Sequence, residues 1–538
     1  MRVRGQLAVL LATTCLVTAV GCSDNEPTKP GVNPPPEVEP TPTTISLARI
    51  GGFAGGAVGA AEITAYDSAS KRLFVVNGAL GSVDVLDLTN PAAPTRVGTI
   101  TATGAANSVD VRGGVVAVAI EATTRTDNGR VTFYQATTLQ QLSSVTVGPV
   151  PDMLAFSPNG RYVVVANEGE PSSTYSIDPE GSVSVIDVQS ISSPTVRTAG
   201  FSSFNGQEAA LRASGVRIYG PNASAAQDFE PEYVAISSDS RTAWVTLQEN
   251  NAIATVDISA ASVTSVRALG FKDHSRAGNG LDVSDRDSPT SMGSVNIRTW
   301  PGLFGMYQPD AIAAYAANGV TYLVTANEGD ARDWPPGLVE EARVSTLTLN
   351  PSVFTDAACG GPCRDNARLG RLTVTNQLGR NATTGQYDAL YVLGGRSFSI
   401  WNATTGMQVW DSGDQLEQRT TALPNVLFNA SSSGNTLDDR SDNKGPEPEG
   451  LALATFGNKT FAFIGLERVG GVMVYDITNP TSPSFVSYVT GRTGDSGDLG
   501  PEGMYFIPAR RSPNGQPLLV VGNEISGTTA IFQITRSF

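Results

Sequence analysis

The sequence predicts an all-β fold built from a ring of repeated four-stranded sheets, and three observations lead to this prediction. Five stretches begin with proline and an acidic residue, continue as a short apolar strand, and lead to a second strand that ends in an acidic residue; they start at Pro151, Pro231, Pro309, Pro448 and Pro501. The strands are short apolar runs bounded by glycine, proline or asparagine. The unit recurs about every 40 residues once insertions are set aside, which is typical of β-propeller blades.

Weaker copies of the unit raise the predicted number of blades to about eight. They begin near Glu62 and near Ser108, and a third lies in the segment 365–411. Seven blades remain the alternative if segment 365–411 is irregular. The last unit has only three strands after Glu502. We therefore expect residues 45–50 to supply its fourth strand and close the ring, which removes the open sheet edges.

The chain is expected to contain a signal peptide at 1–21, a proline-rich tether at 22–43 and a single propeller domain at 44–538. Three insertions are predicted to decorate the ring, near residues 196–228, 271–308 and 412–445. A chain of this length would ordinarily be expected to contain several domains. A propeller is different because each blade packs only on its neighbours, so the ring grows as one unit.

The N-terminal residues have the features of a lipoprotein signal peptide. Arg2 and Arg4 precede an apolar stretch that is too short to span a bilayer comfortably. The stretch ends Ala-Val-Gly-Cys22, which resembles a bacterial lipobox with Cys22 as the lipidated residue; an ordinary signal peptide cleaved nearby is the alternative. The tether that follows would act as a semi-rigid spacer. We expect an exported lipoprotein, anchored in a membrane at the cell envelope or surface.

Charge and cysteine content agree with export and exclude some functions. The net charge of −15 becomes −17 when Arg2 and Arg4 leave with the signal. This charge argues against nucleic acid and against any membrane contact except the lipid anchor, and it favours cations. Cys359 and Cys363 are spaced for a local disulfide in an oxidising compartment. Two thiols without a nearby histidine do not complete a zinc site.

The repeat also predicts where acidic residues collect. The first strand of a blade starts, and the second ends, on the same face of the ring, so these acids should meet at one mouth of the channel. They would repel one another unless cations or arginines neutralise them, and they are the oxygen ligands that Ca²⁺ prefers. Alternatively, they only accept hydrogen bonds from neighbouring blades. The candidates are Asp152, Glu168, Glu232, Glu249, Asp310, Glu328, Asp330, Glu449, Glu467, Glu502 and Glu524.

A second candidate cation site lies in the insertion at 271–308. Asp282, Asp285 and Asp287 lie within six residues, and Asp273 is close in sequence. The pattern resembles a Ca²⁺-binding loop only loosely, because the full helix-flanked motif is absent. A solvated acidic loop is the alternative.

The single histidine limits the possible catalytic chemistry. Because His274 is the only histidine in the sequence, a metal site with several histidines is excluded, and a Ser-His-Asp triad would have to contain His274. Between Asp273 and Ser275, it is interpreted as an ordinary loop residue. No nucleophile elbow, phosphate-binding loop or dinucleotide fingerprint occurs in a convincing context. We therefore assign no catalytic residue.

Several longer motifs carry a family resemblance. They are the segments 270–287, 304–310, 325–332 and 445–450. They resemble the bacterial choice-of-anchor I family, which is related to the mesenchyme-specific cell-surface glycoprotein, and the likeness covers about residues 45–538. The resemblance implies export and attachment through varied anchors, which here would be lipid. Some relatives carry alkaline phosphatase or phytase-like labels, and this link identifies no catalytic residues.

Two functions are consistent with these features. The first is a surface binding or scaffold module, with a Ca²⁺-ordered acidic face that contacts an unknown protein, glycan or phosphorylated ligand. The alternative is a Ca²⁺-dependent phosphoesterase, in which carboxylate-bound cations and nearby basic residues hold phosphate and activate water without a histidine. The basic residues in question are Lys272, Arg276, Arg286 and Arg332. We prefer the binding module.

Overall fold

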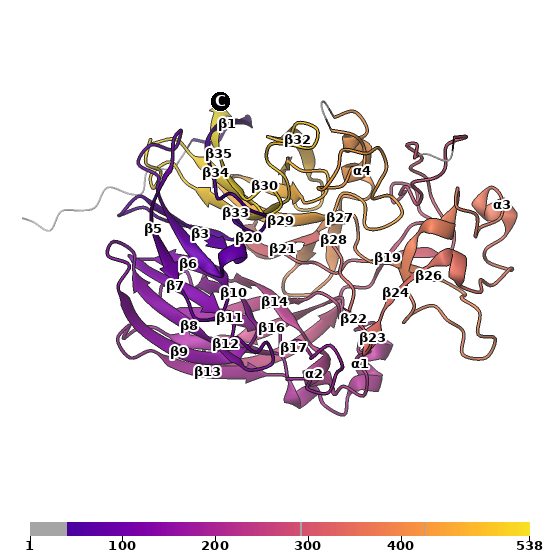
Figure 1. Cartoon of the computed structure of the whole chain (residues 1–538), viewed down its shortest axis with the longest axis horizontal. Coiled ribbons are helices and arrows are strands. Elements are labelled where there is room, and N and C mark those ends of the chain that lie inside the picture. The colour runs from indigo at the N-terminus through magenta and orange to yellow at the C-terminus, as the bar shows by residue number, and fades with distance from the viewer. Residues whose placement is uncertain (1–39, 291–292, 424–425) are drawn as a thin grey trace, which may run out of the picture. The chain divides into compact units, whose positions relative to one another are not determined.

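The computed structural model describes residues 40–290, 293–423 and 426–538; the expected signal peptide and most of the expected tether lie outside this part of the chain. The described strands form seven four-stranded antiparallel sheets, which are the blades of a β-propeller (Figure 1). Their first strands contact one another in a closed cycle, in the order β2, β6, β10, β14, β20, β29, β33 and back to β2. The all-β propeller is confirmed, with the lower of the two expected blade counts.

The first four blades are continuous in sequence. Blade 1 contains β2 (Thr64–Asp67), β3 (Arg72–Asn77), β4 (Ser82–Asp87) and β5 (Thr95–Thr101). Blade 2 contains β6 (Ala106–Arg112), β7 (Val115–Ile120), β8 (Asn128–Gln135) and β9 (Gln141–Pro149). Blade 3 contains β10 (Pro151–Phe156), β11 (Tyr162–Asn167), β12 (Ser182–Asp187) and β13 (Thr195–Gly200). Blade 4 contains β14 (Pro231–Ile236), β15 (Thr242–Leu247), β16 (Ala252–Asp257) and β17 (Ser262–Ala268).

The last three blades include the two interruptions of the repeat. Blade 5 contains β20 (Ile312–Ala317), β21 (Val320–Asn327), β27 (Ser397–Asn402) and β28 (Gln408–Asp411). Blade 6 contains β29 (Pro448–Phe456), β30 (Lys459–Leu466), β31 (Val472–Asp476) and β32 (Ser484–Val489). Blade 7 contains β33 (Pro501–Ile507), β34 (Leu518–Asn523), β35 (Thr528–Ser537) and, from the other end of the domain, β1 (Thr44–Ala54).

The expected eighth unit, segment 365–411, is not a separate blade. Its strand β27 pairs with β21, from Tyr322 opposite Asn402 to Asn327 opposite Ser397. It is therefore the third strand of blade 5, separated from the second by a long insertion between residues 328 and 396. The apolar run near Leu390 belongs instead to a small sheet outside the ring. The apolar run in this insertion was interpreted as an inner strand of an additional blade, and this interpretation gave the count of eight.

Seven apolar clusters hold the ring together, one at each interface between neighbouring blades. Trp244 of blade 4 and Trp401 of blade 5, for example, share one cluster with Leu323. Both faces of each sheet are therefore buried, which explains why the second strands are continuous apolar runs rather than alternating ones. The core lies between the blades and leaves the channel to polar residues.

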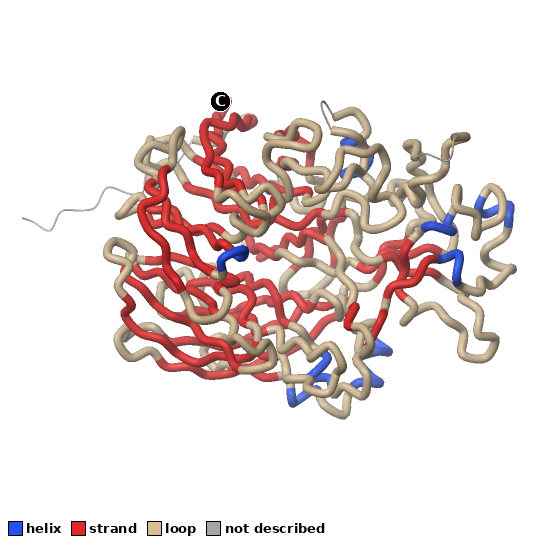
Figure 2. Tube along the Cα trace, viewed as in Figure 1, coloured by secondary structure: helices blue, strands red, loops and turns tan. Residues whose placement is uncertain are grey.

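Two insertions pack together as an elaboration beside blade 5. It contains the sheet of β18 (Phe271–Asp273), β19 (Leu303–Met306) and β26 (Leu390–Val392), the short pairs β22 (Asp333–Trp334) with β23 (Leu338–Val339) and β24 (Glu341–Arg343) with β25 (Thr373–Thr375), and α3 (Asp356–Cys359). Loops dominate this region (Figure 2). One apolar cluster around Trp300 joins both segments. Cys359 and Cys363 form a disulfide within it.

The other inserted segments carry the remaining helices. The insertion expected at 196–228 begins later, because β13 continues to Gly200; it contains α1 (Glu208–Ser214) and α2 (Ala225–Asp228). The segment between blades 5 and 6 contains α4 (Gln415–Thr420). Among the described residues, no helix has the length and apolar character that a membrane span requires.

The expected ring closure is confirmed. Strand β1 pairs antiparallel with β35, from Thr44 opposite Ser537 to Ala54 opposite Thr528. Ile45 is buried in the cluster between blades 6 and 7, while the next residue, Ser46, is exposed. The closing strand therefore contributes side-chain packing as well as backbone hydrogen bonds.

We predict that Ile45→Asp destabilises the protein far more than Ser46→Asp. Removing a buried aliphatic side chain costs about 2–5 kcal/mol, and burying an unpaired charge adds to this cost. An exposed substitution usually changes stability by less than about 0.5 kcal/mol. Thermal unfolding of both variants measures the difference. Equal melting curves would show that the closing strand does not pack in this register.

Candidate functional site

The proline–acid motif forms a β-bulge at the start of the first strand. In blade 3, Pro151 lies opposite Asn167 and Leu154 opposite Val165, so one extra residue is accommodated between the two pairs. The same irregularity occurs at the acidic position of blades 4, 6 and 7. Bulges of this kind redirect side chains at sheet ends and near functional sites. In these four blades, the bulge places the acidic residue that follows the proline at an equivalent position of the sheet.

Seven residues occupy this point, one in each blade, and we call them the axial ring. They are Glu62, Asn107, Asp152, Glu232, Asp310, Glu449 and Glu502. Four of them (Asn107, Asp152, Asp310 and Glu502) line a cavity of about 80 Å³ together with Tyr233. Side chains from blades on different sides of the ring therefore meet at the channel axis.

Neighbouring blades approach closely at this level. A Cβ added to Gly450 would lie 2.2 Å from the main-chain oxygen of Glu502, and one added to Gly503 would lie 2.6 Å from that of Glu62. The glycine in the Pro-Glu-Gly versions of the motif is thus required by contact with the next blade. The acids cannot move apart without separating the first strands.

The carboxylates of the axial ring lack close ion-pair partners in the described part of the chain. Within the described residues, none of the six forms an ion pair, and one oxygen each of Glu232, Glu449 and Glu502 is buried without a hydrogen-bond partner. Burial raises the pKa of Asp152 to about 7 despite the attraction of Arg125. Burial and the nearby carboxylates Glu524 and Asp152 raise the pKa of Glu62 to about 8.

The remaining ring carboxylates are shifted in the same direction. Burial comes first among the causes for Glu232, Asp310, Glu449 and Glu502, followed by repulsion from neighbouring acids, and it raises each pKa well above the usual range. Such groups ionise at neutral pH only if a cation compensates them. The axial carboxylates therefore need either protons or a compensating cation at neutral pH.

Acids at the ends of the second strands form an outer set, which we call the rim. It comprises Glu121, Glu168, Glu249, Glu328, Glu467 and Glu524. Unlike the axial ring, parts of the rim are neutralised. Lys444 lies 2.7 Å from Glu328, and Arg468 lies 2.8 Å from Glu467. Asp330, the last predicted channel acid, is exposed beyond the rim.

Glu447, which directly precedes β29, lies among the neutralised acids of the rim. Arg440, Lys444 and Arg468 all pair with its carboxylate, at 2.6, 3.1 and 3.1 Å. Burial opposes ionisation of Glu447, but the three cations outweigh burial and lower its pKa to about 2. One oxygen each of Glu328, Glu447 and Glu467 lie close together. Because side-chain cations already balance these acids, they attract a metal less than the axial ring does.

The asparagines that end several second strands act inside the blades. Asn167 donates to Ser182 and Ser184 of the third strand, and Asn327 donates to Ser397 and Ser399. Both asparagines are fully buried. They join the second strand to the third, so their recurrence has a structural cause.

The four acids expected in the insertion separate into two kinds. Asp273 pairs with Arg276 at 3.1 Å, and Asp285 pairs with Arg371 at 2.7 Å. These two carboxylates are neutralised. Asp282 and Asp287, in contrast, come together with a third aspartate from another insertion. The expected four-acid loop is thus replaced by a site shared between two segments.

His274 lies in the turn after β18, as the interpretation of an ordinary loop residue implies, and it is buried. Its Nδ1 lies 2.7 Å from the main-chain oxygen of Asn279, and its side chain is almost completely covered. Burial and the nearby Lys272 lower the pKa of His274 to about 3. The ring is therefore neutral throughout the physiological range, and no described serine or acid completes a triad with it.

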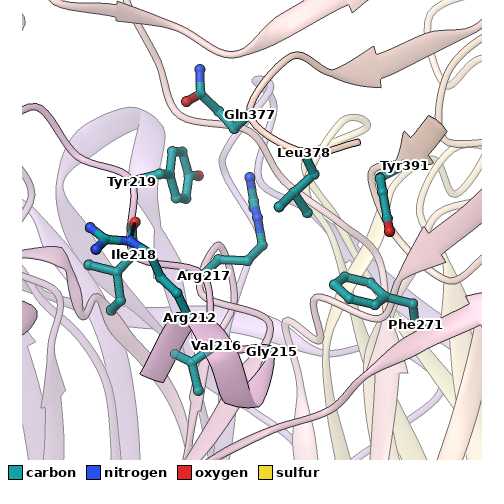
Figure 3. A pocket seen from close by; sticks show the side chains of 10 residues that line it. All are labelled: Arg212, Gly215, Val216, Arg217, Ile218, Tyr219, Phe271, Gln377, Leu378 and Tyr391. Atoms are coloured by element: carbon teal, nitrogen blue, oxygen red, sulfur yellow. Dashed lines mark hydrogen bonds between the residues drawn. The ribbon is translucent and has the colours of Figure 1, made fainter. Parts of the chain in front are cut away.

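A separate cavity of about 400 Å³ lies between the insertion that joins blades 3 and 4 and the elaboration beside blade 5 (Figure 3). Phe271 and Tyr391 form one wall, with ring centres 4.8 Å apart. Arg217 forms part of the opposite side, but it is paired with Glu340 and is hydrogen-bonded by Nη1 to the main-chain oxygen of Glu249. The cavity has the size and mixed lining of a small-ligand pocket.

Comparison with protein families gives a direct assignment for the fold described above. The Choice-of-anchor I domain matches residues 62–480, which is most of the propeller. The chain belongs to the choice-of-anchor I family. The resemblance of its longer motifs to this family is therefore confirmed, and membership indicates a cell-surface protein that fits a binding or scaffold role.

Two curated relatives match parts of this choice-of-anchor I chain. Gigasin-3a of Magallana gigas is 38% identical over 187 residues, covering 31% of this chain and 66% of the relative. The mesenchyme-specific cell surface glycoprotein of Strongylocentrotus purpuratus is 26% identical over 226 residues, covering 37% of this chain and 28% of the relative. The chain therefore spans less than two thirds of the length of either relative.

Solved structures resemble the chain at the level of the whole ring. Hydrazine synthase of Kuenenia stuttgartiensis is 14% identical with a TM-score of 0.47, covering 90% of this chain and 97% of that one. The WD40 domain of Toxoplasma gondii coronin is 8% identical with a TM-score of 0.46, covering 93% and 88%. At these scores, we take nothing about function from either protein.

Some site residues could not be selected from the acid pattern alone. Glu62 occupies the axial position of a weak repeat that lacks the preceding proline, although its place before the first strand was a usable signal. Glu447 lies directly before a proline–acid pair. Asp438 lies in a segment with no repeat pattern, so only the folded structure brings it to Asp282.

We predict that, in the presence of a chelator, the protein loses stability between about pH 6.5 and about pH 8. The axial carboxylates have raised pKa values in the folded state, whereas they ionise near pH 4 when unfolded. In this window the folded state binds more protons, so the free energy of unfolding falls as pH rises. The window lies above the range in which His274, with its lowered pKa, contributes the opposite slope.

Thermal unfolding across this pH window tests the prediction. The melting temperature should fall with pH in chelator and fall less in Ca²⁺, because a bound cation replaces the protons. A melting temperature that rises with pH in chelator would show that the axial carboxylates are not buried as described.

Proposed function

We propose that this chain is an exported binding module whose axial ring holds Ca²⁺ and presents it to a ligand. The observation that supports this proposal is the set of unpaired, largely buried carboxylates from different blades around one small cavity. Ca²⁺ takes six to eight oxygen ligands in flexible geometry, which suits side chains contributed by separate sheets. Mg²⁺ requires a stricter octahedron and gives up its water less readily.

The ligand that we propose carries anionic groups. The protein is strongly acidic, so a carboxylate or phosphate on a partner would be repelled by the bare channel mouth. A bound Ca²⁺ with free coordination positions reverses this repulsion locally. A protein, an acidic glycan or a phosphorylated molecule all offer such groups, and the proposal concerns this shared chemistry.

The phosphoesterase alternative loses the basic residues that favoured it. Its basic residues were expected to hold phosphate, but each is engaged: Arg276 with Asp273, Arg286 with Asp285, and Arg332 with both Asp228 and Glu230. Lys272 is buried and donates to the main-chain oxygens of Gly395 and Gly413. Nothing among the described residues favours hydrolysis over binding.

We predict that Ca²⁺ raises the melting temperature of the chelator-treated protein and that the double variant Asp310→Asn, Glu502→Gln loses a clear part of this response. A ligand at a hundredfold excess over its Kd stabilises the folded state by about 2.7 kcal/mol. For a chain of this length, that corresponds to a shift of a few degrees or less. Mg²⁺ should give a smaller shift at the same concentration.

Glu180→Gln is the matched control, because Glu180 is an exposed acid outside the axial ring. It should retain the full Ca²⁺ response. The proposal fails if the double variant responds to Ca²⁺ as strongly as the unaltered protein, since the cation then binds elsewhere.

We further propose that lipid on Cys22 attaches the module to a membrane. This residue lies outside the described part of the chain, so the proposal rests on the lipobox-like sequence and on family membership. Cys22→Ser should move the protein from the membrane fraction to the soluble fraction, while Cys359→Ser should not. Membrane fractionation of the two variants measures this. Retention of the Cys22→Ser protein in the membrane would exclude the lipid anchor.

A further inference from the structure

Three aspartates from two insertions converge away from the axial ring. Asp282 and Asp287 lie between β18 and β19, whereas Asp438 lies between α4 and β29. One carboxylate oxygen from each lies within 4.8 Å of the other two. Asp282 and Asp438 have an exposed fraction of 0%. The cluster therefore joins segments that are about 150 residues apart in sequence and excludes bulk water from two of its three members.

Hydrogen bonds fix the three carboxylates in place but leave oxygens unused. Asp287 accepts through Oδ1 from the Ser294 amide at 2.9 Å, and Asp438 accepts through Oδ1 from the Ser441 hydroxyl. The second oxygens of Asp287 and Asp438 are buried and have no hydrogen-bond partner. A buried carboxylate oxygen left in this way is costly, which indicates a ligand.

The local charge is uncompensated within the described chain. No lysine or arginine described in the structure lies within ion-pair distance of the three aspartates. Glu417, which accepts a hydrogen bond from the Asp282 amide, already binds Arg396 at 2.7 Å. Burial, with repulsion from its acidic neighbours, raises the pKa of Asp438 to about 9 and that of Asp282 to about 7. Three carboxylates at this spacing require either protons or a cation.

We propose that Asp282, Asp287 and Asp438 bind a Ca²⁺ ion that fastens the two insertions together. Carboxylate oxygens within 4.8 Å of one another can share one cation, and Ca²⁺ binds such oxygens at about 2.3–2.6 Å in flexible geometry, whereas Mg²⁺ demands a stricter octahedron. Asn429 is linked to the cluster through Ser441. Asn429 is fully buried, its Oδ1 has no partner, and its Nδ2 donates to Ser441, the residue that also bonds Asp438.

This site shares no residue with the axial ring, so it stands or falls independently of the proposed function. Its role is structural: the ion would hold the segment around Asp438 against the segment around Asp287. Gly293 fits this tight junction, because a Cβ there would lie 2.3 Å from the Cβ of Asp438. The backbone at Gly293 therefore packs directly against Asp438 of the other segment.

The test compares Asp438→Asn with Asp439→Asn, its exposed neighbour, in the purified protein. Calorimetric titration with Ca²⁺ should show one site whose affinity falls at least tenfold in Asp438→Asn and is unchanged in Asp439→Asn. The effect of Asp438→Asn on the melting temperature should have opposite signs in Ca²⁺ and in chelator. Asp438→Asn should lower it in Ca²⁺, because an ion ligand is lost, and raise it in chelator at pH 8, because repulsion is relieved.

A second variant and readout guard against misfolding of the first. Asp287→Asn, at the less buried ligand, should weaken the same Ca²⁺ site, and Ca²⁺ should slow hydrogen exchange in peptides covering 282–290 and 426–442. The double variant of the axial ring should keep this protection. The proposal is overturned if Ca²⁺ changes neither peptide, or if both aspartate variants bind Ca²⁺ like the unaltered protein. In that case the three aspartates share protons instead.

Discussion

Contact between the first strands of neighbouring blades, held closed by the pairing of β1 with β35, determines how close the axial residues of the channel lie. The first strands of the seven blades touch in a closed cycle, and the last blade takes its outer strand from the other end of the domain. This closure covers the edge of β35 and buries the apolar clusters between blades. It also fixes the distance between the bulges at the axis, so the axial carboxylates are held together by the fold rather than by attraction for one another.

The two sets of acids, though produced by one repeat, differ because of what surrounds them. The rim is reached by side chains from outside the blades: Lys444 and Arg440 come from the segment between blades 5 and 6 and neutralise Glu328 and Glu447. The axial ring lies beside Tyr233 and the neighbouring first strands, where no described basic side chain forms an ion pair with it. Repetition of sequence therefore does not imply repetition of function. Acids of the rim form structural ion pairs, whereas the axial carboxylates form none among the described residues.

Features of this structure could be predicted from the sequence when they depend on residues that are close together in the chain. Strands, the closing strand and the axial position all depend on patterns within about ten residues, such as proline before an acid and an apolar run after it, and these were predictable. The blade count depended on a longer range, because the partner of β21 begins only at Ser397. Pairing of Asp285 with Arg371, and of Asp282 with Asp438, requires the insertions to pack first. No local pattern identifies such partners.

The segment between blades 5 and 6 connects the two proposed cation sites physically. Asp438 belongs to the insertion cluster, and Lys444, six residues later, pairs with Glu328 and Glu447 at the rim. Between them, Arg396 donates to the main-chain oxygens of Ser441 and Asn443. An ion that fixes Asp438 would therefore restrict the backbone that carries Lys444. Since Lys444 neutralises the rim next to the axial ring, ordering it changes the potential that a second cation meets there. Coupling of this kind is reciprocal in free energy: whatever the first ion does for the second, the second does for the first.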